Sequence, residues 1–189
     1  MREFVLISKG ATEPFHLRSL PNSGRMDVVC NCVRSVFWLS FEIRKDSIFH
    51  VFLYGKPKPP VYIRFEGRRM KRISPDERNI AIIIRKALEN LQEYEVESTP
   101  GVFVSRKDFK DFLEDYNGRN IYVLRENGKK FDTVKIEKDP VFIVGDHKGF
   151  MPEHEKILEG FPGISLGGKR YLSSHCIVIV NYLLDMMGF

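Results

Sequence analysis

The sequence has few cysteines, no long apolar run and no obvious secretory leader. It has three cysteines in 189 residues, an odd number that does not suit a disulfide framework. The start "MREFVLISKG" has too short an apolar core and too early an acidic residue for a signal peptide. No apolar run approaches the roughly 18 residues that a membrane-spanning helix needs. We therefore expect a cytoplasmic protein with free thiols and no membrane contact.

Several ligand-binding motifs are also missing. No G-x-x-x-x-G-K-[ST] loop is present, and no G-x-G-x-x-G follows a strand, which excludes the common nucleotide-binding folds. The pair Cys30 and Cys32 is expected on different faces of one helix, and no Cys or His pair has the spacing of a zinc site. The histidines form no visible ligand set either; they are His16, His50, His147, His154 and His175. We expect no metal.

The residues that are present indicate one α/β domain spanning 1–189. Hydrophobic residues make up 43% and charged residues 29% of the chain, as in ordinary globular proteins. Strand patterns occur at 3–8, 47–55, 61–67, 101–105, 121–127 and 140–145. Helix patterns occur at 24–40, 74–91, 106–118 and 151–160. This alternation predicts a mostly parallel sheet flanked by helices, with a β-hairpin extension at about 48–72.

Two helices stand out in the sequence. In "SPDERNIAIIIRKALENL" we expect Ser74 as the N-cap, Pro75 at the first helical position and Glu77 completing a capping box. The stretch "GGKRYLSSHCIVIVNYLLDMM" at 167–187 predicts a C-terminal helix that is apolar on almost every side. Such a helix must be covered all round, and the central helix of a monomer is one way to cover it.

Positive charge is concentrated in the first part of the chain. Residues 1–75 carry a net charge of +8 and residues 76–189 a net charge of −3. The densest run is "RFEGRRMKR", where one acid accompanies five basic residues: Arg64, Arg68, Arg69, Lys71 and Arg72. Such density suits a polyanion such as RNA, whereas the plainer interpretation is a solvated hairpin.

Three loops are expected at the carboxyl ends of the strands, where ligands bind in parallel sheets. They are 123–128, 144–150 and 163–176. The second has Gly145 and Gly149 around Asp146, which is also ordinary turn chemistry. In the third, Gly167 and Gly168 permit close approach of a ligand to the backbone. Ser173 or Ser174 is expected to cap the last helix.

Longer stretches carry a family resemblance. "FIVGDHKGF" followed by "SLGGKRYLSSHCIVIVNYLLD" resembles the archaeal tRNA pseudouridine-54 N1-methyltransferases (TrmY), knotted SPOUT enzymes that use S-adenosylmethionine. "LPNSGRMDVVCNCVRSVFWLSFEIRKD" and "SPDERNIAIIIRKAL" match the same family, so the likeness covers nearly the whole chain. It implies a C-terminal trefoil knot at about 120–189 and a homodimer through the last helix. It also implies N1-methylation of pseudouridine 54 in the T-loop of tRNA.

The resemblance also implies site residues. The S-adenosylmethionine site would be lined by Leu124, Gly145, Ile164, Ser165, Leu166, Gly167, Leu172 and Cys176. We read Cys176 as a pocket wall, because N1 attacks the methyl group directly and no covalent enzyme adduct is needed.

The stretch "GRMD" places two candidate catalytic residues at the start of a helix. We assign Asp27 as orienter or base toward N1 and Arg25 as a contact to a phosphate or carbonyl oxygen. An Asp in a first turn is also favoured by the helix dipole alone. Arg78 is a further candidate for RNA contact.

Two other functions stay open. One keeps the chemistry and changes the RNA to a pseudouridine in ribosomal RNA. The other is an RNA-binding dimer without catalysis. Weak cofactor binding together with intact RNA binding would favour the second.

Overall fold

The computed structural model describes residues 1–189 and contains one mixed sheet of eight strands. The strand order is β4-β5-β3-β2-β1-β7-β6-β8. From β2 to β8 every pairing is parallel, and from β2 to β4 every pairing is antiparallel. The strands are β1 (Arg2–Ser8), β2 (Ser47–Leu53), β3 (Val61–Glu66), β4 (Val96–Thr99), β5 (Val102–Ser105), β6 (Ile121–Lys130), β7 (Val141–Gly145) and β8 (Gly163–Ser165).

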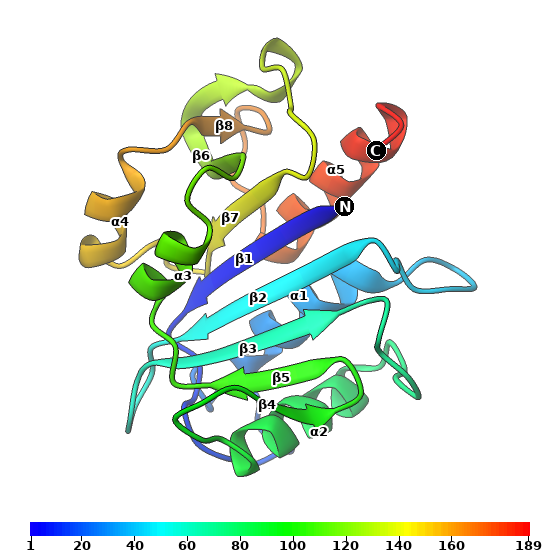
Figure 1. The fold of residues 1–189 in the computed structure, drawn as a ribbon, viewed down its shortest axis with the longest axis vertical. Helices are drawn as coiled ribbons and strands as arrows, with labels where there is room; N and C mark the ends of the chain where they lie inside the picture. Colours follow the sequence, from blue (N-terminus) through cyan, green and yellow to red (C-terminus); the bar gives the residue numbers. More distant parts are fainter.

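Helices cover both faces of this sheet (Figure 1). They are α1 (Met26–Phe37), α2 (Glu77–Glu89), α3 (Phe109–Asp115), α4 (Pro152–Leu158) and α5 (Ser173–Met186), with a short 3-10 turn at Phe131–Thr133. Alternate residues of β1 enter two separate cores, as strand geometry requires. Phe4 and Leu6 pack with α1, α2 and α5, whereas Val5 and Ile7 pack with α3 and α4. The predicted α/β class with a mostly parallel sheet is confirmed.

The register gives the sheet two distinct edges. Ser8 at the end of β1 lies beside Leu53 of β2, and Ile7 lies beside Gly145 of β7. We call this side, where the parallel strands end, the cleft edge. Because β3 runs the other way, its last residue Glu66 lies beside Ile48, at the start of β2. We call that side the far edge.

The structure corrects several local predictions. The N-cap of α2 is Asp76, whose carboxylate accepts the Asn79 N–H at 2.9 Å, and Ser74 instead donates its hydroxyl to Asp76. Strand β4 was not predicted, and part of the expected loop 163–176 is strand β8. Strands β2 and β3 do form a hairpin, and both lie inside the sheet.

Helix α5 buries only one face in the single chain. Ile177, Val180 and Leu184 are fully buried against the α1 side of the core. On the outward side, Val178, Tyr182 and Met186 are 50%, 60% and 71% exposed. The expectation that every side is covered is therefore not met within one chain.

The remaining expectations concern cysteines, metals and membranes. All three cysteines are free, and Cys30 and Cys32 are both buried, two positions apart on helix α1. No group of His, Cys, Asp and Glu is arranged to hold a metal ion. No helix combines the length and the apolar character needed to span a bilayer.

Candidate cofactor cleft and active site

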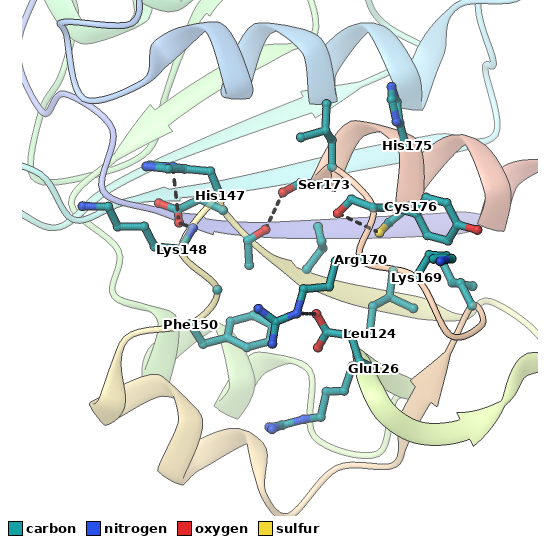
Figure 2. A pocket seen from close by; sticks show the side chains of 18 of the residues that line it. Leu124, Glu126, His147, Lys148, Phe150, Lys169, Arg170, Ser173, His175 and Cys176 are labelled. Carbon is teal, nitrogen blue, oxygen red and sulfur yellow. Dashed lines mark hydrogen bonds and ion pairs between the residues drawn. The ribbon is translucent and has the colours of Figure 1, made fainter.

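A cleft of about 970 Å³ opens at the cleft edge, lined by β6, by the ends of β7 and β8 and by the segments that follow β7 and β8 (Figure 2). Seven of the eight cofactor-site residues predicted from the sequence line it. They are Leu124, Gly145, Ile164, Leu166, Gly167, Leu172 and Cys176. The eighth, Ser165, lies behind the wall, where its hydroxyl exchanges hydrogen bonds with the backbone of Gly167 at 3.2 Å. The structure thus brings the whole predicted set together.

Glycines shape the floor and rim of the cleft. A Cβ on Gly145 would lie 2.7 Å from the carbonyl carbon of Gly149, so only glycine lets the loop after β7 close on itself. Gly167 has φ 125°, a conformation that L side chains rarely adopt. No atom lies within 4 Å of a Cβ built on Gly167 or Gly168. Bare backbone therefore faces open space at the rim.

Asp146 fastens the loop after β7 to the loop after β1. Its side chain is buried, and its two oxygens accept the backbone N–H groups of Lys9 at 3.0 Å and Lys148 at 2.8 Å. His147 lies 3.7 Å from the same carboxylate. Because both oxygens of Asp146 are occupied, we read this residue as the brace of the cleft rather than as a reacting group.

The start of α5 differs from the sequence prediction. Its N-cap is Leu172 and no side chain caps the helix. Ser173 instead donates its hydroxyl to the carbonyl oxygen of Gly145 at 2.7 Å (Figure 2). This bond joins the first turn of α5 to the end of β7, so two walls of the cleft are linked directly.

Charged side chains at the cleft were not assigned from the sequence. Arg125 donates to Glu155 at 2.6 Å. Arg170 pairs with Glu126 at 3.2 Å (Figure 2). Arg125 and Glu126 lie in the predicted loop 123–128, and Arg170 lies in the predicted loop 163–176. These positions are the only indication in the sequence that the three residues belong to the site. Glu155 lies on α4, which only the fold brings to the cleft.

Cys176 is a wall of the cleft and not a reactive thiolate. Burial raises its pKa above the usual value for cysteine, and its sulfur lies 3.9 Å from the Tyr171 carbonyl oxygen. A thiol with a raised pKa stays protonated at neutral pH. The geometry agrees with the pocket-wall reading of this residue.

Arg25 and Asp27 form a tight pair beside the cleft rather than in its lining. Arg25 Nε and Nη2 each donate to the Asp27 carboxylate at 2.9 Å. Those hydrogen bonds hold the pKa of Asp27 below its ordinary value. Arg25 has φ 61°, which costs energy in a residue other than glycine and often marks functional sites. The preceding Gly24 packs on the Lys9 carbonyl, which places the pair at the cleft edge.

The predicted RNA-binding arginines and lysines lie elsewhere. Arg64 pairs with Glu66 and Glu95, and Arg69 with Glu97 at 2.8 Å. The segment that follows Glu66 lies at the far edge, where Gly67 abuts Arg44 and Ser47. The other four predicted contacts are exposed and form no ion pair: Arg68, Lys71, Arg72 and Arg78.

Known proteins share this architecture. The structure superposes on that of Nep1 from Archaeoglobus fulgidus bound to S-adenosylhomocysteine with a TM-score of 0.68 and 17% identity, covering 97% of this chain and 96% of that one. The fold is therefore of the SPOUT type. The family described as "Putative SAM-dependent RNA methyltransferase" matches residues 1–189, and the chain belongs to it.

Curated relatives resemble the chain along its whole length. The tRNA (pseudouridine(54)-N(1))-methyltransferase of Methanocaldococcus jannaschii is 42% identical, over 98% of this chain and 97% of the relative. The protein of the same name from Methanococcus aeolicus is 45% identical, over 98% of both chains. The resemblance seen in the sequence is confirmed.

Proposed function

We propose that this protein transfers a methyl group from S-adenosylmethionine to N1 of pseudouridine 54 in the T-loop of tRNA. The observation that carries the proposal is the full-length identity of 42% to 45% with relatives of that name. The cleft supports it, because the residues expected to hold the cofactor converge there from β6, from the end of β7 and from the segment 164–176.

The cleft fits a nucleoside-sized ligand. Its volume of about 970 Å³ lies at the upper end of the range for small-molecule sites, roughly 300–1,000 Å³. Leu124, Ile164 and Leu166 offer apolar contacts for a planar base, and Gly167 offers unobstructed backbone. When bound, the cofactor supplies an electrophilic methyl group on a sulfonium. The residues of this chain then hold it and exclude water.

Arg25 and Asp27 are the proposed catalytic residues. S-adenosylmethionine held in the cleft would supply the methyl group to N1 of pseudouridine and leave as S-adenosylhomocysteine, and the N1 proton would have to be removed. The carboxylate of Asp27, kept ionised by Arg25, accepts the N1–H as a hydrogen bond and orients the ring. Its lowered pKa makes it a weak base, so the proton passes finally to solvent. Arg25 faces the negative charge that develops on the adjacent carbonyl oxygen.

The proposal includes a homodimer through α5 and the trefoil knot implied by the family. The exposed apolar side of α5 supports the dimer, since Val178, Tyr182 and Met186 otherwise face water. We propose the cytoplasm as its location, which suits three free cysteines. The substitution Tyr182→Glu should convert the dimer to a monomer in light scattering, with Lys156→Glu, an exposed residue on α4, as its control.

The test uses S-adenosylmethionine labelled in the methyl group and three tRNA transcripts. One carries pseudouridine at position 54, one carries uridine there, and one carries its only pseudouridine at position 55. We expect label in 1-methylpseudouridine from the first transcript alone. Label that appears only with ribosomal RNA fragments would establish the second candidate substrate. Absence of cofactor binding would leave the RNA-binding dimer without catalysis.

A further inference from the structure

We propose that three lysines of the cleft edge dock the phosphate backbone of the RNA whose base enters the cleft. They are Lys9, in the loop after β1, and Lys56 and Lys58, in the loop between β2 and β3; together we call them the lysine ridge. This inference rests on the proposed function, because it takes RNA as the substrate. It differs from the sequence-based assignment of RNA contacts to the segment that follows β3.

The strand order places the ridge next to the cleft. Strand β1 lies between β2 and β7, so the loops after β2, β1 and β7 follow one another along the edge. The backbone N–H of Lys9 is bound directly to Asp146 in the cleft, at 3.0 Å. Neighbouring strands are about 4.8 Å apart, so the loop of Lys56 begins roughly 10 Å from Gly145. A bound polynucleotide can reach both at once.

The loop of the ridge is held rigidly. Thr12 donates its hydroxyl to the Gly55 carbonyl at 3.1 Å and accepts the Lys58 N–H, also at 3.1 Å. Gly55 N–H donates to the Gly10 carbonyl at 3.0 Å. From the other side, Arg106 donates to the carbonyl oxygens of Lys58 and Pro60. Bonds from two neighbouring loops thus fix the backbone that carries Lys56 and Lys58.

The charges of the ridge are free. All three lysines are exposed, and none forms an ion pair. Arg64, in contrast, is neutralised by Glu66 and Glu95 and lies over the Phe103 ring. Phosphate contacts are made largely by lysine and arginine side chains. The ridge lysines extend from a hydrogen-bonded backbone, and no acid inside the chain competes with phosphate for them.

The arrangement suits a chain of phosphates better than a single small anion. Lys9 and the 54–60 loop follow adjacent strands, so the three lysines are attached at successive positions along the edge. A polynucleotide presents evenly spaced negative charges along such a row. The ridge therefore positions the RNA, and the cleft selects and modifies the base.

The test compares two double variants. Lys56→Gln/Lys58→Gln removes two ridge charges and keeps most of each side chain. Arg68→Gln/Lys71→Gln removes two charges of the far edge, which are equally exposed and unpaired. Binding of a fluorescent tRNA transcript is measured at several salt concentrations, alongside affinity for S-adenosylhomocysteine and the melting temperature.

We expect the ridge variant to bind tRNA about 10-fold more weakly, with the slope of log K against log salt reduced by about 2. Its cofactor affinity and melting temperature should match the wild type, and the far-edge variant should bind tRNA within twofold of wild type. Unchanged tRNA binding in the ridge variant, or an equal loss in the far-edge variant, would overturn the inference. The proposed function fails separately, if wild-type protein binds tRNA and transfers no methyl group to it.

Discussion

The two edges of the sheet differ in whether their charged residues have partners inside the chain. At the far edge, buried charged residues have partners inside the chain: Glu3 accepts hydrogen bonds from His50 at 2.9 Å, Tyr116 at 2.5 Å and Arg119 at 2.6 Å. Arg2 is likewise buried against Asp185 at 2.8 Å. At the cleft edge, lysines and glycine backbone face open space.

The difference separates stability from function. Groups whose partners all lie inside the chain contribute to folding and have nothing left to offer a ligand. Groups without internal partners add little to stability and are available to substrate. Substitutions at the far edge should therefore change stability and spare binding, whereas substitutions at the cleft edge should do the reverse.

The largest effect is expected from Asp27→Asn at the cleft edge. Because an amide cannot orient the N1–H as the carboxylate does, kcat should fall about 10²- to 10⁴-fold. Affinity for S-adenosylhomocysteine, measured by calorimetry, should stay the same, since Asp27 does not line the cleft. Glu13→Gln, an exposed residue in the loop between β1 and α1, is the control. A kcat equal to that of the wild type would mean that Asp27 only stabilises the start of α1 through the helix dipole.

The far edge should respond to Glu3→Gln with a loss of stability. Burial alone would raise the pKa of Glu3, but hydrogen bonds from His50, Tyr116 and Arg119 lower it from 4.5 to about 2. Breaking this buried set should cost about 3 kcal/mol in urea unfolding, with cofactor affinity unchanged. If affinity fell as much as stability, the two edges would not be independent.

The same carboxyl predicts an acid limb in the stability of the wild type. A group whose pKa is lower in the folded state stabilises the fold above its unfolded pKa, and that contribution disappears as the pH falls through the folded value. Stability should therefore decline between about pH 4.5 and pH 2. In Glu3→Gln this decline should be shallower, and urea midpoints across that range measure the difference.

Gly145→Ala should weaken cofactor binding about 100-fold. The new methyl group would lie 2.7 Å from backbone of Gly149, so the loop after β7 must move away from the ligand. A shift of about 1 Å at a site commonly costs two orders of magnitude. Gly160→Ala is the matched control, because its Cβ would come no closer than 3.9 Å to any atom. Equal affinities in calorimetry would show that the loop does not shape the cleft.

The smallest effect is expected from Cys176→Ala. Its thiol has a raised pKa and serves as a wall, so methyl transfer should change less than about threefold, through lost packing alone. Iodoacetamide should modify Cys176 slowly at pH 7 and faster as the pH rises. Loss of all activity in Cys176→Ala would point to a covalent mechanism instead.

Elements with a local apolar pattern could be predicted from the sequence, whereas strands that form only by pairing with distant segments could not. Helix α2 has a clear apolar stripe and strand β1 is a continuous apolar run, and both were predicted. Of the three loops expected at the cleft, 123–128 lies within β6, and 163–165 form β8. Strand β4 reads VEST and β8 reads GIS, so each has a single apolar residue and neither shows a strand pattern. Missing β4 had a consequence, because Glu97 lies on that strand and Glu95 directly before it, and these acids neutralise Arg69 and Arg64. The sequence therefore overstated how many arginines of the dense basic run are unpaired.

The ion pair between Arg2 and Asp185 also has a consequence for folding during synthesis. Arg2 begins β1, the strand at the centre of the sheet, yet its partner β7 starts at Val141 and Asp185 lies on the last helix. A ribosome releases the N-terminus first. Strand β1 must therefore wait, paired only with β2, while most of the chain is synthesised. Such distant contacts slow folding, so maturation of this enzyme should lag behind its translation.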